Sequence, residues 1–246
     1  MGDGEQPVHA ETNILVMKRY LITGASRGIG RAIAEQLAAA DVALFLHGRD
    51  TVALADACQS VRARSAKVIP LIHDLALTSG VSNLIAEIGS EPIDLLVNNA
   101  GVAVVKPFCE ITGVEWEQTL GVNVTAPFLL TQHFATRMPP GSSIVNILSV
   151  AAKTGFPGWS AYCMSKFALE GFSQSVREEL RDHKIRMINV YPAATNTEIW
   201  NKVHGEWPRE KMMPPTEIAS AVAYALSRPS DVALENITLT SVTGNL

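Results

Sequence analysis

The sequence lacks the features that mark several large classes of protein. Its three cysteines, at positions 58, 109 and 163, form no CxxC motif and leave one without a partner, which argues against a disulfide framework and favours a reducing compartment. The six histidines show no HExxH or other metal-binding spacing, so no metal is expected. No Lys/Arg run exceeds Lys18-Arg19 and the formal net charge is −4, so nucleic acid is not an expected partner.

Long apolar runs and linkers are also missing. Apolar stretches such as residues 144–148 are far too short to cross a membrane, and residues 1–11 are acidic and polar where a signal peptide would be basic and then apolar. No Pro/Gly/Ser-rich linker divides the 246 residues. We therefore expect a cytoplasmic protein with no membrane partner and a single domain over residues 17–246. Residues 1–16 are expected to be an N-terminal extension that need not be ordered.

What is present is an alternation of strand-like and helix-like segments in a chain that is 47% hydrophobic. Strands are expected at residues 19–23, 42–46, 67–71, 93–97, 142–148, 185–190 and 237–240. Helices are expected to follow at residues 29–37, 52–64, from 79, 114–137, 161–183 and 216–227. This order predicts an α/β fold: one doubly wound Rossmann-type domain with a parallel sheet of about seven strands.

The first expected strand runs into a glycine-rich turn, Gly24-Ala25-Ser26-Arg27-Gly28-Ile29-Gly30, and then into a helix. Glycines let a ligand approach the backbone, and the free N–H groups of a helix's first turn attract phosphate oxygens. The spacing G-x-x-x-G-x-G departs from the G-x-G-x-x-G dinucleotide motif. A tight turn with nothing bound is an equally good interpretation of this feature taken alone.

The end of the second strand bears on the choice of nucleotide. An acid at this position binds a ribose 2′-OH, whereas an arginine accommodates a 2′-phosphate. Here Gly48 stands where the acid is expected and Arg49 follows, with Arg27 able to converge from the glycine turn. These residues predict NADP(H), with NAD(H) as the other possibility. The alternative for Arg49 is a surface ion pair with Asp50.

Two further strand ends carry polar or small residues. Asp74, followed by Leu75, could accept from an adenine amine or cap the helix that begins near residue 79. Asn98-Asn99-Ala100-Gly101 follows the fourth strand, in the crevice where open α/β sheets bind ligands.

The segment Tyr162-Cys163-Met164-Ser165-Lys166 carries a phenol and an ammonium four residues apart, on one face of an expected helix. A cation beside the phenol favours its ionised form, so Tyr162 could act as an acid or base near neutral pH. Ser149, at the end of the fifth strand, could bring a hydroxyl beside that phenol. Asn123 stands on a mostly apolar helical stretch and needs partners, for which neighbouring backbone carbonyls are the simplest choice.

Together these residues resemble the short-chain dehydrogenase/reductase family from about residue 18 onward. The T-G-x-x-x-G-x-G pattern is matched by Thr23, Gly24, Gly28 and Gly30, the N-N-A-G pattern by Asn98–Gly101, and the Asn-Ser-Tyr-Lys tetrad by Asn123, Ser149, Tyr162 and Lys166. The resemblance implies a Rossmann-type enzyme that interconverts a carbonyl and a secondary alcohol with a nicotinamide cofactor. Its expected cofactor contacts are Gly24, Ser26, Arg27, Gly28, Ile29, Gly30, Arg49, Asp74, Leu75, Asn98, Ala100, Gly101, Tyr162, Lys166, Pro192, Thr195 and Thr197.

The resemblance also implies a role for each tetrad residue. Tyr162 donates the proton to the carbonyl oxygen, and Ser149 bonds the same oxygen. Lys166 lowers the pKa of Tyr162 and binds the nicotinamide ribose, while Asn123 holds a water that resupplies the proton. This is general acid catalysis with fixed donors, the cofactor carrying the hydride.

The sequence departs from the family pattern in two places. Ala193 follows Pro192 where the family usually has glycine, and residues 237–246 lack the glycine-rich end of the 3-oxoacyl carrier-protein reductases, so that substrate is not assigned. A non-catalytic nucleotide-binding sensor or scaffold is the alternative from another class, which the intact tetrad disfavours. An extended-branch epimerase or dehydratase would show T-G-x-x-G-x-x-G and a longer C-terminal half.

Two expectations concern larger surfaces. By the resemblance, the helices at residues 114–137 and 161–183 pair across a dyad, giving a homodimer or homotetramer. Residues 195–215 are expected to form a flap over a small-molecule substrate, with Trp200 and Trp207 as apolar walls. The alternative for this segment is a fixed loop whose tryptophans pack on the core.

Overall fold

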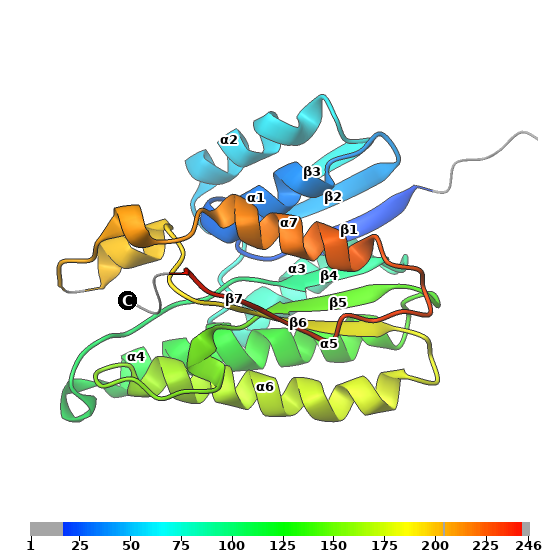
Figure 1. Ribbon diagram of the computed structural model, residues 1–246. Helices are drawn as coiled ribbons and strands as arrows, with labels where there is room; N and C mark the ends of the chain where they lie inside the picture. Colours follow the sequence, from blue (N-terminus) through cyan, green and yellow to red (C-terminus); the bar gives the residue numbers. More distant parts are fainter. Residues whose placement is uncertain (1–16, 204, 243–246) are drawn as a thin grey trace, which may run out of the picture.

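The structure is a computed structural model that describes residues 17–203 and 205–242, so the expected extension over residues 1–16 lies outside the described residues. One parallel sheet has the strand order β3-β2-β1-β4-β5-β6-β7 (Figure 1). Its strands are β1 (Lys18–Ile22), β2 (Val42–His47), β3 (Lys67–Leu71), β4 (Leu95–Asn98), β5 (Ser143–Ile147), β6 (Arg186–Pro192) and β7 (Asn236–Leu239). The predicted fold class and the seven parallel strands are confirmed.

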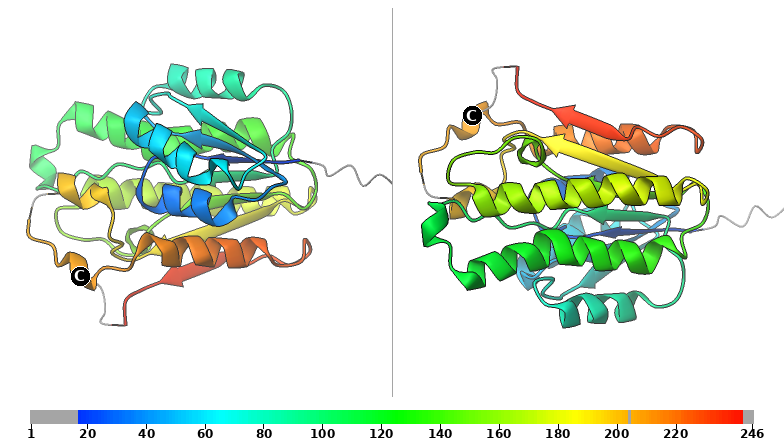
Figure 2. Two further views of the ribbon diagram at one scale, coloured as in Figure 1. Left: turned by 90° about the horizontal axis from the view of Figure 1, so that it is seen from above. Right: turned by 90° about the horizontal axis from the view of Figure 1, so that it is seen from below.

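Helices cover both faces of the sheet. One face carries α1 (Gly28–Leu37), α2 (Thr51–Arg62) and α7 (Pro215–Leu226), and the other carries α3 (Thr78–Ile88), α4 (Gly113–Leu120), α5 (Ala126–Ala135) and α6 (Ser160–Leu180). The two views in Figure 2 show α1 beside α7 on the first face and α5 beside α6 on the second. With both faces covered, neighbouring residues of a central strand are buried on opposite sides: Leu21 and Ile22 are each 0% exposed.

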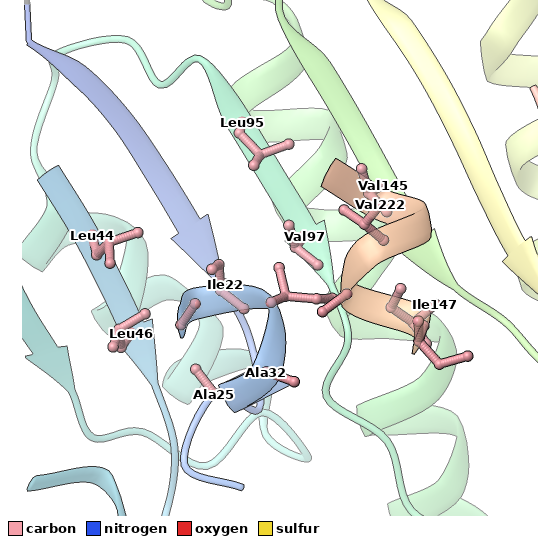
Figure 3. Close-up of a cluster of buried hydrophobic side chains, with 14 of the residues drawn as sticks. Ile22, Ala25, Ala32, Leu44, Leu46, Leu95, Val97, Val145, Ile147 and Val222 are labelled. Carbon is pink, nitrogen blue, oxygen red and sulfur yellow. The ribbon is translucent and has the colours of Figure 1, made fainter. Parts of the chain in front are cut away.

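The core beneath α1 and α7 shows why the central strands are apolar throughout. Ile22, Val97 and Val145 project from neighbouring strands toward Ala32 of α1 and Val222 of α7 (Figure 3). Ala32 is small, which lets helix and sheet approach closely, and Val222 is 0% exposed. This packing fixes where α1 begins, and therefore where the glycine turn lies.

The strand order reverses between β1 and β4, and a doubly wound sheet binds ligands beside such a reversal, at the carboxyl ends of its strands. Short 3₁₀ turns follow β6 at Glu198–Lys202 and Arg209–Lys211. This part of the chain, orange in Figure 1, overhangs the same edge of the sheet. The fold therefore brings the carboxyl ends of β1 and β4 and the long connection after β6 to the same edge of the sheet.

The expected helix over residues 114–137 is divided. Between α4 and α5 lies a π-helical turn, Gly121–Thr125, in which the N–H of Ala126 bonds the carbonyl of Gly121 five residues earlier. A π turn inserts a residue into the helical repeat, a feature that apolar periodicity does not reveal and that is frequent at functional sites. The helix expected to reach residue 183 ends at Leu180.

Within the described residues, no helix is both long enough and apolar enough to cross a bilayer. The same part of the chain contains no group of three or more His, Cys, Asp or Glu side chains that could hold a metal ion. Cys58, Cys109 and Cys163 are free.

Candidate active site

A threonine ties the end of β1 to the end of β4. Thr23 is 2% exposed, and its Oγ1 donates to the carbonyl of Val97 at 3.0 Å. The same oxygen accepts from the backbone N–H groups of Asn99 (2.9 Å) and Ala100 (3.0 Å). One hydroxyl therefore satisfies three backbone groups and holds the two turns at a fixed separation.

The glycine turn has the shape of an anion site. Gly24 has φ +64°, and a Cβ there would lie 2.8 Å from the Cα of Ala100, so only glycine fits. Arg27 at the N-cap of α1 makes no side-chain capping bond, which leaves the first-turn N–H groups of α1 available to a phosphate oxygen. Gly30 serves packing instead: a Cβ there would lie 2.3 Å from the carbonyl oxygen of Gly24.

His47, at the end of β2, is a site residue that the sequence reasoning missed. It is 3% exposed, its Nδ1 accepts from the N–H of Gly24 at 3.3 Å, and its Nε2 donates to the carbonyl of His73 at 2.9 Å. These two bonds require the neutral ring with its proton on Nε2. Burial lowers the pKa of His47 to about 4, so the ring stays neutral at physiological pH and supports the glycine turn.

The two arginines predicted to meet a 2′-phosphate already have carboxylate partners. Arg27 pairs with Asp50 at 2.7 Å, and Arg49 pairs with Asp74 at 3.5 Å. The alternative of an Arg49–Asp50 pair is therefore wrong. The carboxylate of Asp50 also caps α2 by accepting from the N–H of Ala53, because a strand end that leads directly into a helix needs a cap there.

The alternative in which Asp74 caps the helix after β3 is also wrong. Asp74 accepts from the N–H of Ala76 at 3.0 Å, whereas the N-cap of α3 is Leu77 and has no side-chain capping bond. The physical reason is that the local turn closes two residues before the helix begins. The carboxylate of Asp74 faces Arg49 at the cleft instead.

The two asparagines after β4 point in opposite directions. Asn99 donates to the carbonyls of Thr23 (2.8 Å) and Gly24 (3.0 Å), so it stabilises the glycine turn. Asn98 is 3% exposed and donates to Asn146 Oδ1 at 2.9 Å, in a row of amides that continues to Asn189. These three asparagines are in register on β4, β5 and β6. The side chain of Asn98, predicted to contact the cofactor, thus links strands away from the cleft.

Tyr162 and Ser149 meet at the cleft. Ser149 lies directly after β5 in extended backbone, and its Oγ accepts from the N–H of Ala151 at 3.1 Å. Burial raises the pKa of Tyr162 to about 12, and a hydrogen bond with the Ser149 hydroxyl opposes this shift. At neutral pH the phenol is therefore protonated and able to donate.

Lys166 lies one helical turn after Tyr162 on α6. Its Nζ donates to the carbonyl of Ile147 at 2.9 Å and lies 5.6 Å from the Tyr162 ring centroid. Burial lowers the pKa of Lys166 itself to about 8. The ammonium thus bonds the end of β5, and the effect of Lys166 on the pKa of Tyr162 stays a prediction.

Asn123 sits inside the π turn with its amide fully paired. Its Oδ1 accepts from the N–H of Val102, and its Nδ2 donates to the carbonyl of Val102 and to Ser165 Oγ, each at 2.9 Å. Ser165 Oγ in turn donates to the carbonyl of Tyr162 at 2.7 Å. Asn123 is thus satisfied largely by backbone and connects the turn after β4 to the helix that carries Tyr162.

A cleft of about 820 Å³ runs along this edge of the sheet. The structure brings most of the predicted contacts together there: Gly24, Ser26, Arg27, Gly28, Ile29, Arg49, Asp74, Leu75, Ala100, Gly101, Ser149, Tyr162, Pro192, Thr195 and Thr197 line it. Gly30, Asn98, Asn123 and Lys166 lie behind that surface. Trp159 and Phe156 also line the cleft, and the sequence analysis did not predict them as site residues. Trp159 could have been found from its spacing, because a residue three positions before Tyr162 lies close to it on a helix.

The connection after β6 closes one side of the cleft. Thr195 forms a β-bridge with Met213, and the indole N–H of Trp200 donates to the carbonyl of Thr195 at 2.8 Å. Trp200 and Trp207 pack against each other with ring centroids 4.8 Å apart, and both line the cleft. The tryptophans therefore form a wall of the cleft, as predicted, and pack against one another as well.

The cleft fits an extended dinucleotide. A Cβ at Gly28 would lie 3.0 Å from Thr197, so this narrow passage between the glycine turn and the β6 connection depends on glycine. Uncapped helix N–H groups lie at this passage, arginines lie at one end, and Ser149 and Tyr162 lie at the other. The order matches phosphate, adenosine and nicotinamide positions in a doubly wound fold.

Comparisons with known proteins agree with this geometry. The family model for short chain dehydrogenase matches residues 18–207. Sepiapterin reductase from Chlorobaculum tepidum is 35% identical over 237 residues, which cover 92% of this chain and 97% of that protein. Carbonyl reductase [NADPH] 2 from Sus scrofa is 30% identical over 226 residues, 85% of this chain and 88% of that protein.

Solved structures show the same fold. An alcohol dehydrogenase from the archaeon Thermococcus sibiricus, complexed with 5-hydroxy-NADP, superposes with a TM-score of 0.82 at 26% identity, covering 94% of this chain and 99% of that chain. The NADP-bound angucycline C-6 ketoreductase LanV gives a TM-score of 0.78 at 28% identity, with 91% and 94% covered. The chain belongs to the short-chain dehydrogenase/reductase family, whose enzymes act on CH–OH and C=O groups with NAD(P).

Proposed function

We propose that this protein reduces a ketone or aldehyde with NADPH, with Tyr162 as the general acid. The observation that carries the proposal is the meeting of the Tyr162 phenol and the Ser149 hydroxyl at one end of a cleft whose other end holds Arg27 and Arg49. The bound cofactor supplies the hydride to the carbonyl carbon. The protein supplies the proton and the oxygen-binding groups.

The proposed steps use the chain's own groups. The carbonyl oxygen accepts hydrogen bonds from Tyr162 and Ser149, which stabilise the negative charge that develops as the carbon is reduced. Tyr162 then gives its proton to that oxygen, which completes the alcohol. A phenol with a pKa of about 12 is protonated at pH 7, so its resting form suits reduction rather than oxidation.

The test is Tyr162→Phe, which removes the transferable proton and keeps the ring. Turnover of a panel of ketones and aldehydes, followed by the loss of NADPH absorbance, should fall by about 10²-fold or more, while NADPH still binds. Tyr224→Phe, an exposed tyrosine of α7, is the matched control and should leave turnover unchanged. NADPH binding with no reduction of any carbonyl by the native protein would instead support the non-catalytic sensor or scaffold.

The proposal includes a preference for NADP(H) over NAD(H). Arg27 and Arg49 line the cleft near the end of β2, and Gly48, which also lines it, carries no carboxylate that would repel a 2′-phosphate. Relatives whose names include NADP or NADPH support this choice. The measurement is the ratio of kcat/KM for the two cofactors. Arg49→Ala should lower the NADPH to NADH ratio of kcat/KM. Arg181→Ala, which removes an exposed ion pair at the end of α6, should leave that ratio unchanged.

We also propose that the protein is a homodimer or homotetramer assembled through α5 and α6. These helices lie side by side on the outer face in Figure 2, and each exposes a large apolar side chain: Phe128 is 40% exposed and Phe167 is 46% exposed. Phe128 also packs edge-on against Phe172, with centroids 5.6 Å apart. Apolar side chains presented together on a flat face favour association about a dyad.

A reducing compartment such as the cytoplasm completes the proposal. It is supported by the three cysteines, all free in the structure. Measurement of the thiol content of protein purified from its own cell would test it: disulfide-linked chains would speak against a reducing compartment.

A further inference from the structure

Three of the chain's four tryptophans and one phenylalanine gather at one end of the cleft. Phe156, Trp159, Trp200 and Trp207 line it there, and we call these four residues the aromatic wall. Only 6% of the residues are aromatic, so this gathering is a concentration of a scarce residue type. The fourth tryptophan, Trp116, lies on α4 outside the cleft and is 41% exposed.

Contacts among the rings hold the aromatic wall together. The centroid of Trp159 lies 5.7 Å from that of Trp200 and 6.1 Å from that of Trp207, in edge-on arrangements. Trp200 is fixed further by its indole hydrogen bond to the carbonyl of Thr195. Two separate segments, the loop before α6 and the connection after β6, therefore present their aromatic rings as one surface.

One residue of the aromatic wall, Trp159, contacts Tyr162, the predicted proton donor. The ring of Trp159 lies edge-on to the ring of Tyr162, with centroids 5.5 Å apart and planes 69° apart. When the oxygen of a carbonyl group accepts a hydrogen bond from Tyr162, a group attached to the carbonyl carbon would thus lie within reach of the Trp159 ring.

The charged side chains that line the cleft lie elsewhere. Arg27 with Asp50, and Arg49 with Asp74, form pairs near the ends of β2 and β3. The carboxylate of Glu198 lies beside the glycine turn, 3.7 Å from where a Cβ of Gly28 would be. In the part of the chain that the structure describes, the other side chains that line the cleft around Tyr162 are uncharged, among them Val102, Gln118 and Ile199. The ammonium of Lys166 lies 5.6 Å from the Tyr162 ring centroid but does not line the cleft and is bonded to the carbonyl of Ile147. A substrate carboxylate or phosphate would find no cationic side chain on this lining.

We infer that the substrate is an uncharged ketone or aldehyde with a planar aromatic or conjugated ring next to the carbonyl, and that Trp159 is the residue that selects it. This inference rests on the proposed reductase function. The ring packs against the aromatic wall while the carbonyl oxygen meets Tyr162 and Ser149. A 2-oxo acid is excluded by its charge, and a polyhydroxylated sugar by the scarcity of hydrogen-bonding side chains on the wall.

The experiment compares kcat/KM for three ketones with NADPH: acetophenone, cyclohexyl methyl ketone and phenylglyoxylate. The first two have similar size, but only acetophenone has a planar ring, so the aromatic contact should favour it by roughly 2- to 12-fold. Phenylglyoxylate keeps the ring and adds a carboxylate, and should be reduced at least about 10-fold less efficiently than acetophenone. Trp159→Leu should lower the acetophenone to cyclohexyl ratio by the same roughly 2- to 12-fold, because it removes the ring contact and leaves the intrinsic difference in reactivity between the two ketones unchanged. Trp116→Leu, the matched control, should leave it unchanged.

Binding of the product alcohols separates this inference from the proposed function. With NADP⁺ present, calorimetry should show tighter binding of 1-phenylethanol than of 1-cyclohexylethanol, and this preference should be lost in Trp159→Leu. If no ketone is reduced but the preference in binding is found, the reductase function fails while the aromatic selection stands. Equal affinities of the native protein for the phenyl and cyclohexyl alcohols would overturn the inference. So would equal losses of kcat/KM for the two ketones in Trp159→Leu.

Discussion

Acid should destabilise the folded protein through His47, a residue outside the predicted tetrad. Burial lowers the pKa of His47 from 6.5 to about 4, and the neutral ring accepts the N–H of Gly24. Between pH 6.5 and pH 4 the unfolded chain binds more protons at this position than the folded chain. The contribution of His47 to the free energy of unfolding is therefore full above about pH 6.5 and is lost as the pH falls toward 4.

The size of the effect follows from the shift in pKa. Each unit of pKa shift corresponds to about 1.4 kcal/mol, so the shift of His47 contributes about 3 kcal/mol to the free energy of unfolding at high pH. About 2 kcal/mol of this contribution should be lost between pH 7.5 and pH 5. Lys166, whose pKa is lowered to about 8, contributes only about 0.2 kcal/mol in this range, because it is mostly protonated in both states. Such a loss is a large share of the stability of an ordinary domain.

Urea unfolding at pH 7.5 and pH 5 measures this loss. His47→Asn keeps an acceptor near the position of Nδ1 but cannot be protonated, so its stability should change by about 2 kcal/mol less than that of the native protein between the two pH values. His183→Asn, an exposed histidine after α6, controls for the replacement of a histidine. Comparison of changes with pH, rather than of absolute stabilities, removes any constant cost of the substitution. A native pH dependence retained in full by His47→Asn would refute the reasoning.

Three further predictions concern the cofactor, the assembly and the connection after β6. Lys166→Met, which keeps the volume of the side chain, should abolish turnover and weaken NADPH binding measured by nucleotide fluorescence; unchanged affinity would show that Lys166 does not reach the cofactor. Phe167→Glu should convert the assembly to a 26.5 kDa monomer in light scattering, and a native monomer at all concentrations would contradict the assembly itself. Binding of NADPH and a competent substrate should protect residues 195–215 from limited proteolysis, because the carboxylate of Glu198 beside Gly28 must move away from incoming phosphates; equal cleavage with and without ligands would indicate a fixed loop.

The parts of the fold that were predictable depend on short stretches of sequence. Apolar runs that are buried on both faces identify parallel strands, and their alternation with helices fixes the doubly wound order. Gly24 and Gly28 are recognisable because their turn joins a strand to a helix, an order that allows a phosphate site but is equally compatible with an empty turn until the other motifs are added. Ser149 follows from the same logic because it lies directly after β5, whereas Tyr162 lies in the first turn of α6 and is recognisable from its spacing to Lys166.

The parts that were not predictable depend on contacts between distant segments. The amide row of Asn98, Asn146 and Asn189 requires the register of three strands, which no single segment encodes. The pairing of His47 with Gly24 crosses two strand ends. Likewise, the i, i+4 spacing predicts that Tyr162 and Lys166 share a helix face. It does not predict the hydrogen bond from the Lys166 ammonium to the carbonyl of Ile147, which lies on a different element.

Under the proposed preference for NADP(H), cofactor selection would be an exchange of ion pairs, and Asp50 should limit it. A 2′-phosphate that recruits Arg27 takes it from Asp50, whose carboxylate stays in place because the N–H of Ala53 holds it at the start of α2. That remaining negative charge opposes the phosphate, although solvent screening weakens the effect at this exposed position. Asp50→Asn keeps the helix cap, since asparagine caps as well as aspartate, and removes the charge. It should therefore raise the NADPH to NADH ratio of kcat/KM by roughly two- to five-fold. Asp56→Asn removes a carboxylate that pairs with Arg31 on the outer side of α1 and serves as the matched control. An unchanged or lowered ratio in Asp50→Asn would show that the phosphate does not approach Arg27.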